Sequence, residues 1–318
     1  NSTPKRRNSP WGRLRLMPSA LEKRASRFFE ILRLSDLISQ LPGETEPLFL
    51  AKKMRTYEAE AAFTVSVLDR YGALSDKKAR LLDVGCGVGL TSLFLASEGF
   101  KTVGVEPVGS GFDFMGRLPQ IASERYSSVT GLNPPPIDRA QVEEVSSSWG
   151  QFDVAFSINV LEHVASPAEA LSAIHRLVRP GGLHIHLCPN YSFPYEPHFQ
   201  IPLIPGSPSA TSWLLPKKIR NSDLWHSLNF VRYRDVAAWA TTIQGPVKFR
   251  PDSTLRAYER LSDQVFASRH RLLGRILKIF PSSASRWLLE RLPENLQSPM
   301  EFAVFKSEPT GSDEELKS

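Results

Sequence analysis

Residues 81–90, LLDVGCGVGL, are the stretch whose residue types and spacing point most directly to chemistry. An apolar run ends at Asp83, and Gly85, Gly87 and Gly89 then alternate before a run that suits a helix. Glycine reaches positive φ at little cost and lets a ligand lie against the backbone, and a following helix offers unpaired N–H groups. The pattern predicts a strand, a glycine loop and a helix that bind a nucleotide-like ligand at the carboxyl end of a first β-strand.

The spacing of these glycines separates two classes of nucleotide site. The dinucleotide fingerprint G-x-G-x-x-G, begun at Gly85, requires glycine at position 90, which is Leu90 in this chain. The pattern D-x-G-x-G-x-G that is present resembles that of the class I S-adenosylmethionine-dependent methyltransferases. Their cofactor carries a free ammonium where NAD carries a pyrophosphate, so the Asp83 carboxylate suits it and would oppose phosphates. The alternative is a tight turn that binds nothing.

A second acid, Glu106, ends the short apolar run that begins at Lys101, and it lies 17 residues beyond Gly89. A carboxylate at the tip of the second strand can accept hydrogen bonds from both ribose hydroxyls, in this family and in NAD-binding folds alike. It supports a nucleoside ligand without choosing between the two, the alternative being a surface glutamate. The family also implies an adenine-contacting acid near residues 137–142, where Gln141 could bond the adenine amino group instead.

Residues 151–164, QFDVAFSINVLEHV, form a second informative run. An apolar strand over 154–158 ends at Asn159, which places that residue beside the first strand in a doubly wound sheet. The run resembles the fourth-strand motif of small-molecule methyltransferases, including those that O-methylate ubiquinone precursors. The Asn/Asp-Pro-Pro-Tyr/Phe tetrad of enzymes that methylate exocyclic amines of bases is missing, because Val160 and Leu161 follow Asn159. This absence makes a nucleic-acid acceptor a weaker hypothesis.

His163 is the titratable group nearest the predicted methyl-transfer site. An imidazole with an ordinary pKa of about 6.5 could accept a proton from a hydroxyl group, which favours O-methylation. The alternative is a structural histidine at a strand-to-helix junction, with Glu162 capping or pairing. The sequence leaves both open.

The resemblance implies S-adenosyl-L-methionine as the cofactor and a set of residues around it. The candidates for cofactor binding are Asp83, Gly85, Cys86, Gly87, Gly89, Glu106, Pro107, Gln141, Asn159 and Val160.

Residues 189–225 are rich in proline and aromatic residues and are too irregular to predict a helix or sheet pairing. Long insertions at the carboxyl end of an α/β sheet are usually functional, and in related enzymes this segment lines the acceptor pocket. Packing of a proline-rich lid onto the domain is the alternative. The candidates for holding an apolar or aromatic substrate are Tyr191, Phe193, Tyr195, His198 and Phe199.

His184, His186, Glu196 and His198 are the side chains in this region that could bind a metal ion. Imidazole and carboxylate ligands suit a divalent ion, and the two strand histidines share one face. However, one face of an interior strand normally packs under a helix, away from the sheet tip. The sequence therefore predicts no metal site.

Patterns on either side of these motifs predict an α/β fold with a doubly wound, seven-stranded, mostly parallel sheet. Ser19 and Glu22 form a capping-box pattern for a helix to about residue 40, and a second helix is expected over 47–71. A fifth strand over 183–188, a helix over 231–242 and a sixth strand over 246–250 follow. Amphipathic helices then precede an antiparallel closing strand over 302–305.

This architecture divides the chain into expected segments. They are a flexible basic arm (1–17), an N-terminal helical cap (18–78), a methyltransferase domain (79–308) with a substrate lid at 189–228 and a basic helical insertion at 253–295, and a disordered acidic tail (309–318).

Composition is that of an ordinary soluble globular protein, with 41% hydrophobic and 23% charged residues. No apolar stretch approaches the roughly 18 to 20 residues of a transmembrane helix, and no export signal is recognisable. The two cysteines, Cys86 and Cys188, exclude a disulfide framework, which predicts a reducing cytoplasm.

The net charge of +6 is concentrated at the periphery, with a surplus of seven positive charges in residues 1–34 and five in residues 254–292. Contact with RNA or with an anionic membrane surface would explain this distribution, and a solvated helix face is the alternative.

The sequence thus predicts an enzyme that transfers a methyl group from S-adenosylmethionine to a small molecule, with an oxygen acceptor favoured. The alternatives are an RNA methyltransferase and a catalytically silent binding protein of the same fold. The acceptor and the oligomeric state are not predicted.

Overall fold

The structure is a computed structural model that describes residues 19–40, 47–107, 116–243, 245–262, 266–267 and 282–308. The predicted basic arm, the predicted acidic tail and the middle of the predicted basic insertion lie outside the described residues.

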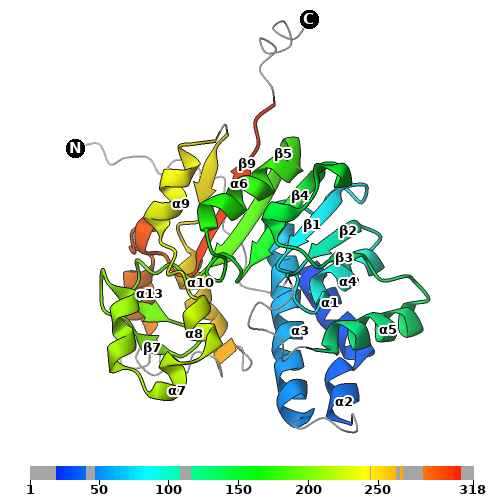
Figure 1. Ribbon diagram of the computed structural model, residues 1–318, viewed down its shortest axis with the longest axis horizontal. Helices are drawn as coiled ribbons and strands as arrows, with labels where there is room; N and C mark the ends of the chain where they lie inside the picture. Colours follow the sequence, from blue (N-terminus) through cyan, green and yellow to red (C-terminus); the bar gives the residue numbers. More distant parts are fainter. Residues whose placement is uncertain are drawn as a thin grey trace, which may run out of the picture.

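A seven-stranded sheet in the order β3-β2-β1-β4-β5-β9-β8 forms the centre of the protein (Figure 1). Strand β9 runs antiparallel to both of its neighbours, and the other pairings are parallel. The predicted doubly wound, mostly parallel sheet is therefore confirmed. The strands are β1 (Arg80–Val84), β2 (Lys101–Val105), β3 (Ile137–Asp138), β4 (Phe152–Ile158), β5 (Val178–Cys188), β8 (Val247–Phe249) and β9 (Met300–Phe305).

The strand order places the candidate site. Because β2 and β4 lie on opposite sides of β1, the connections that leave β1 and β4 diverge and open a crevice at the carboxyl ends of these strands. The central strands are buried on both faces, as a parallel sheet with helices on each side requires, and this explains their near-continuous apolar runs.

Helices cover the sheet in two layers. One hydrophobic core joins one face to α1 (Ala20–Leu32), α2 (Leu34–Ser39), α3 (Pro47–Arg70), α4 (Leu90–Ser97) and α5 (Leu118–Thr130). A second core joins the other face to α6 (Pro167–Leu177), α8 (Asp223–Ser227) and α9 (Tyr233–Ala240). Figure 1 shows α1, α2, α3 and α5 gathered on one side of the molecule and α7 (Lys217–Arg220), α8 and α13 (Ser282–Leu289) on the other.

The first N-terminal helix has the predicted cap, but the predicted single helix is divided into two. The Ser19 hydroxyl accepts a hydrogen bond from the Glu22 backbone N–H at 3.1 Å, as the capping-box pattern predicted. The expected single helix to residue 40 is interrupted at Arg33, whose φ of 51° is left-handed, so α1 ends there and α2 begins. Nothing in the local residue pattern marks this change of direction.

The segment between β5 and α9 is more regular than the sequence indicated. It contains the antiparallel pair β6 (Tyr195–Glu196) and β7 (Ile201–Pro202), the 3-10 helix η4 (Pro208–Leu214), α7 and α8. The expectation of neither helix nor sheet pairing was wrong, because elements of two to seven residues are too short to produce a periodic pattern. Trp225 of α8 is buried in the second core and anchors the segment there.

The remaining elements are the helix α10 (Ser253–Glu259) and the 3-10 helices η2 (Val142–Glu144), η3 (Ser147–Trp149), η5 (Arg260–Ser262) and η6 (Glu294–Leu296). No helix in the described ranges combines the length and the hydropathy that crossing a bilayer requires.

Candidate active site

The glycine loop after β1 has the backbone geometry that its sequence predicted. Gly85, Gly87 and Gly89 all have positive φ, and the Gly85 N–H donates to the Val105 carbonyl at 2.8 Å. A Cβ on Gly85 would overlap the Val160 side chain, whereas a Cβ on Gly87 would meet nothing within 4 Å. The loop is thus packed tightly on one side by Val160 and is open at Gly87, which leaves its backbone accessible to a ligand.

Asp83, the acid ahead of the first glycine, is 5% exposed at the end of β1. It accepts a hydrogen bond from the Ser92 hydroxyl at 2.8 Å, and Thr102 donates to Ser92 at 3.3 Å. Burial raises the pKa of Asp83 to about 7 in spite of the Ser92 hydrogen bond, and the nearby Glu106 charge adds to the rise. The fold therefore holds a carboxylate whose ionisation would be favoured by a positively charged ligand.

Glu106 follows β2 and faces the same loop. Its Oε2 accepts a hydrogen bond from the Gly87 N–H at 2.8 Å. Burial raises the pKa of Glu106, while the Gly87 hydrogen bond and the charge of Arg139 act in the opposite direction. The carboxylate that the sequence placed at the second strand tip thus lies directly at the glycine loop.

These groups fit the predicted cofactor. Among the described residues, neither Asp83 nor Glu106 forms an ion pair, so the loop presents two buried acids to its ligand. Asp83 would hold the ammonium of S-adenosylmethionine and Glu106 its ribose hydroxyls. A phosphate-bearing cofactor would instead be repelled by both.

Three further candidates for cofactor binding are Cys86, Pro107 and Gln141. Cys86 packs against Gly104, and burial raises the pKa of its thiol well above the usual value. Pro107 is half-buried and is the last residue described before a gap at 108–115. Gln141 is exposed, and its side chain caps η2. Its proposed contact with adenine stays a prediction.

The turn after β4 connects the glycine loop to a cluster of titratable groups. Asn159 has a φ of 57° and donates its N–H to the Leu187 carbonyl at 2.8 Å, which ends the strand. The Asn229 side chain donates to the carbonyls of Leu161 and Val164 at 2.7 and 2.8 Å. This clamp fixes the turn, so Val160 packs on Gly85 while the residues two and three positions later project at a defined place.

Glu162, His163 and His198 form the cluster. Each offers one ligand-type atom, and these three atoms all lie within 4.8 Å of one another. The rings of His163 and His198 meet edge to face, with centroids 5.1 Å apart. His163 Nδ1 lies 2.9 Å from the Ser227 hydroxyl, and His198 Nδ1 lies 2.6 Å from Glu196 Oε1. His198 thus joins the turn from a segment 35 residues further along the chain.

The electrostatics of this cluster follow from its burial. Glu162 is completely buried, and neither of its carboxylate oxygens has a hydrogen-bond partner among the described residues. Burial raises the pKa of Glu162 to about 7. Burial, with a contribution from His198, lowers the pKa of His163 to about 3, so this imidazole is neutral at pH 7. Sequence reasoning found His163 and His198 separately. It treated Glu162 only as a partner of His163 and did not bring the three together.

The aromatic candidates for substrate binding divide into two groups. Tyr191 is buried, its hydroxyl lies 3.4 Å from Glu196, and its ring packs edge to face on Phe230. Phe199 packs on the second core. Phe193 and Tyr195 are only half-buried. The last two therefore have surface left for a ligand, whereas Tyr191 contributes to packing.

The metal set considered from the sequence is divided by the fold. His184 and His186 are buried in a chain of hydrogen bonds in which Ser157, His186, His184 and His175 follow one another at 2.7, 2.6 and 3.1 Å. They lie under α6 and α9, next to Trp239, as expected for the face of an interior strand. Glu196 and His198 lie in the other cluster, with Glu162 and His163.

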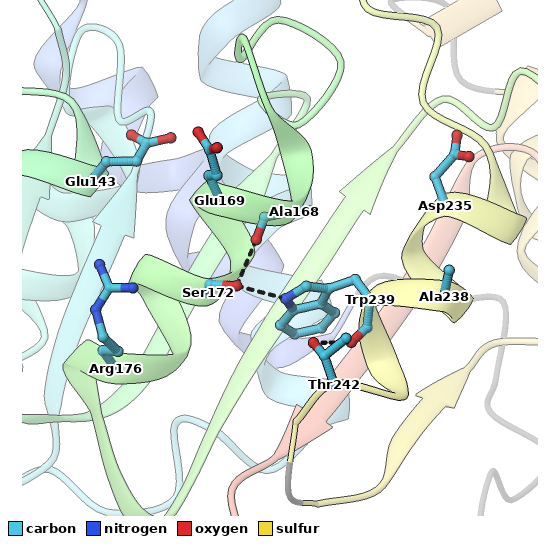
Figure 2. Close-up of a pocket in the computed structure, with 9 residues that line it drawn as sticks. All are labelled: Glu143, Ala168, Glu169, Ser172, Arg176, Asp235, Ala238, Trp239 and Thr242. Atoms are coloured by element: carbon cyan, nitrogen blue, oxygen red, sulfur yellow. Dashed lines mark hydrogen bonds between the residues drawn. The ribbon is translucent and has the colours of Figure 1, made fainter.

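A separate hollow of about 800 Å³ lies between α6 and α9 (Figure 2). Its centre is Trp239, whose Nε1 donates to the Ser172 hydroxyl at 2.9 Å, and Ser172 donates in turn to the Ala168 carbonyl. None of the predicted cofactor or substrate residues lines it. This hollow is therefore distinct from the site around the glycine loop.

Comparison with known proteins gives a consistent family. A family model described as a methyltransferase domain matches residues 54–244, more than half of the chain. An uncharacterised protein of Mycobacterium tuberculosis is 35% identical over 222 residues, which cover 66% of this chain and 73% of that protein. The ubiquinone biosynthesis O-methyltransferase of Pseudomonas aeruginosa is 34% identical over 121 residues, 37% of this chain and 47% of that enzyme.

Solved structures with similar folds have low sequence identity. The phosphoethanolamine N-methyltransferase 2 of Haemonchus contortus, in complex with S-adenosyl-L-methionine, is 15% identical with a TM-score of 0.49, covering 86% of this chain and 60% of that one. The [4+2]-cyclase SpnF is also 15% identical, with a TM-score of 0.47 over 92% of this chain and 99% of that one.

Proposed function

Because this chain belongs to the methyltransferase domain family and is a class I S-adenosylmethionine-dependent methyltransferase, we propose that it methylates a hydroxyl oxygen of a small molecule. The observation that carries the proposal is the Glu162–His163–His198 cluster, because it lies beside the cofactor loop and contains groups that can bind and deprotonate a hydroxyl. The partial match to ubiquinone biosynthesis O-methyltransferases, which covers about half of their length, is consistent with an oxygen acceptor.

The bound cofactor supplies a methyl group made electrophilic by its sulfonium. The protein therefore has three tasks: to hold the cofactor, to position the acceptor beside it and to remove a proton from the acceptor. Asp83 and Glu106 hold the cofactor, and the Val160 contact with Gly85 fixes the wall between the loop and the acceptor side. The turn clamped by Asn229 positions the cluster against that wall. Proximity and orientation of this kind can contribute about 7 to 11 kcal/mol.

The third task is removal of the hydroxyl proton, which we assign to His163. The Ser227 hydroxyl donates to the Leu224 carbonyl, so it accepts from His163 Nδ1–H and leaves Nε2 as the basic nitrogen. This Nε2 lies 3.9 Å from Glu162 Oε1. Since burial lowers the pKa of His163, the imidazole is a weak base alone, and an ionised Glu162 would stabilise its protonated form.

A comparison of hydroxyl and amine acceptors tests the proposed O-methylation. With S-adenosylmethionine present, a panel of phenols, catechols, alkyl alcohols and matching amines should give methyl ethers, identified by mass and NMR. His163→Asn should lower turnover by about 10²- to 10⁴-fold while S-adenosylhomocysteine binds as in the wild type. Exclusive N- or C-methylation, or turnover unchanged in His163→Asn, would contradict the oxygen acceptor or the base role respectively.

We further propose that the acceptor is lipid-soluble and is met at a membrane surface. Trp213 and Leu214 at the end of η4 are 75% and 70% exposed, and Lys217 and Lys218 follow immediately on α7. Indole and leucyl side chains beside lysines are typical of segments that rest on an anionic bilayer. Sedimentation with phosphatidylserine vesicles should retain the wild type and release Trp213→Ser/Leu214→Ser; equal retention of both would contradict the assignment.

The described basic residues give no comparable support to RNA as the acceptor. In the second basic segment, Arg286 pairs with Glu259 and Glu290, and Arg256 pairs with Asp252. Charges neutralised in this way contribute little to binding a polyanion.

A further inference from the structure

We propose that Glu162, His163 and His198 bind a divalent transition-metal cation, and that this cation holds the oxygen of the acceptor. The inference rests on the proposed function for the role of the cation, but the binding site itself stands on the geometry of the cluster. Two imidazoles and one carboxylate offer three ligand atoms within 4.8 Å of one another.

The carboxylate of Glu162 is the group in this cluster that requires a partner. Its carboxylate is completely buried, and neither oxygen receives a hydrogen bond from any residue that the structure describes. A buried carboxylate normally has a charged or hydrogen-bonding partner, because desolvation without one is costly. His163 Nε2, at 3.9 Å, is too far to serve as a donor, and the Ser227 bond leaves this nitrogen without a proton. A cation bound by Glu162 would compensate the charge of this carboxylate.

The hydrogen bonds outside the cluster orient its ligands as in known metal sites. Glu196 Oε1 lies 2.6 Å from His198 Nδ1, so the carboxylate accepts a hydrogen bond from Nδ1–H and Nε2 is the unprotonated nitrogen of this ring. Glu196 is itself buried and is fixed by the Phe199 N–H at 2.7 Å. Ser227 gives His163 the same tautomer from a different element. Carboxylate or hydroxyl groups behind ligating imidazoles are typical of bound metals.

The charges around the cluster also favour a cation. The buried acidic side chain of Glu196 lies against the cluster, with its Oε1 2.6 Å from His198 Nδ1. Among the described side chains, no lysine or arginine forms an ion pair with Glu162 or Glu196. His198 is 21% exposed, so one side of the cluster is open to solvent and to an acceptor.

The ligand set indicates the class of metal. Two histidines and one carboxylate suit Zn²⁺, Mn²⁺, Fe²⁺ or Co²⁺, and three protein ligands leave positions open for a substrate oxygen. With His163 Nε2 occupied as a ligand, the cation replaces this imidazole in activating the acceptor: a hydroxyl bound to the cation loses its proton to solvent more easily, because the cation lowers the pKa of the hydroxyl. The oxygen then forms its bond to the methyl carbon as the sulfur–methyl bond breaks. The balance is one acceptor hydroxyl and one cofactor consumed, with one methyl ether, one S-adenosylhomocysteine and one proton released.

Metal binding can be measured without turnover. EDTA-treated, full-length protein should bind about one equivalent of Zn²⁺ by calorimetry, and Co²⁺ should give the visible absorption of a histidine-containing site. Glu162→Gln and His198→Asn should weaken Zn²⁺ binding by at least about 100-fold, and Glu196→Gln by about 10- to 100-fold. S-adenosylhomocysteine affinity, measured in parallel, should stay within about twofold of the wild type and would show that each variant is folded.

Two histidine variants outside the cluster serve as controls. His226→Asn removes an exposed imidazole on α8, and His175→Asn removes the outermost member of the other histidine chain. Both should bind Zn²⁺ as the wild type does. No stoichiometric binding by the wild type, or equal affinity in Glu162→Gln and His198→Asn, would overturn the site.

Measurements of metal binding and of turnover on the same protein distinguish the metal site from the proposed O-methylation. Metal-free enzyme that methylates hydroxyls at the full rate would refute the role of the cation and leave O-methylation standing. Stoichiometric metal binding at this cluster in a protein that methylates no hydroxyl would refute O-methylation and leave the metal site standing.

Discussion

At the scale of single residues, burial controls the chemistry of this protein. Asp83 and Glu162 are carboxyl groups that the fold removes from water, and burial raises the pKa of each to about 7. The two acids differ in their hydrogen bonds: Asp83 accepts one from the Ser92 hydroxyl, whereas the oxygens of Glu162 have no donor in the part of the chain that the structure describes. A positive ligand would favour the ionised form of each acid, and we propose the ammonium of the cofactor for Asp83 and a metal cation for Glu162.

Cofactor affinity should depend on pH through Asp83. Because its pKa in the free protein is raised to about 7, the carboxylate is ionised above that pH and increasingly protonated below it. An ammonium ligand binds the ionised form, so the affinity for S-adenosylhomocysteine should be constant above pH 7 and fall by up to about tenfold per unit below it. Calorimetry between pH 5.5 and 8 measures this slope.

Asp83→Asn is the control for that slope. It should bind more weakly at pH 8 and show a much flatter dependence on pH. A wild-type affinity that does not change between pH 8 and 5.5 would contradict the electrostatic role of Asp83.

The close approach of Gly85 to Val160 gives a second prediction. Gly85→Ala should weaken cofactor binding by at least tenfold, since its Cβ would overlap Val160 at a positive φ. Gly99→Ala is the matched control, because φ is also positive there and nothing lies within 4 Å. Adding Val160→Ala to Gly85→Ala should restore part of the affinity; no recovery would show that the conformational cost alone, and not the contact, is responsible.

At the scale of elements, the turn between β4 and α6 is positioned by a segment far along the chain. Asn229, between α8 and α9, binds two carbonyls of this turn with its side chain and the Glu162 carbonyl with its N–H. The same segment supplies Ser227 to His163. The segment after β5 therefore fixes the geometry of the turn and the orientation of His163.

Asn229→Asp should uncouple this turn from the insertion. The substitution keeps the shape of the side chain but removes both donors, so two buried carbonyls lose their partners at a cost of about 1 to 3 kcal/mol each. We expect lower unfolding free energy in urea and weaker Zn²⁺ binding, with S-adenosylhomocysteine affinity preserved. Asn221→Asp, at an exposed position after α7, should change neither; loss of Zn²⁺ affinity there too would point to a general charge effect.

At the scale of the whole molecule, a buried ionic network ties the N-terminal helices to the last strands. Glu301 of β9 forms two ion pairs. Its Oε2 lies 3.1 Å from Nη2 of Arg70 in α3, and its Oε1 lies 3.4 Å from Nη1 of Arg250, which follows β8. Arg250 is 1% exposed and also pairs with Asp252. The predicted helical cap is therefore joined to the methyltransferase sheet by charge as well as by the shared apolar core.

Breaking this network should be costly. Glu301→Gln removes the charge that two buried or half-buried arginines share, and the loss of one partner in a buried pair typically costs about 3 to 5 kcal/mol. Asp36→Asn, which removes the exposed pair with Arg33, should cost less than about 1 kcal/mol. Urea unfolding at pH 7 compares them, and equal stabilities of the two variants would contradict the structural role of the network.

Much of the fold and of the cofactor site could be predicted from the sequence, because both have local signatures. The glycine spacing, the acids at the ends of β1 and β2 and the apolar run of β4 each lie within a few residues, and parallel strands bring their carboxyl ends to one edge. The short elements after β5 and the break at Arg33 could not be predicted, since two- to seven-residue elements have no period and a left-handed arginine has no sequence marker.

The sequence by itself determined the class of enzyme and the reagent it uses, because Asp83 and the glycines that follow it form a contiguous pattern. Only the tertiary structure decided which side chains come together after β4, next to the glycine loop. His198 meets Glu162 and His163 across 35 residues of chain, and Asn229 and Ser227 orient them from still further away. Burial of Glu162 without a donor among the described residues is likewise a property of packing, since the solvation of a side chain depends on every element around it and not on its neighbours in sequence.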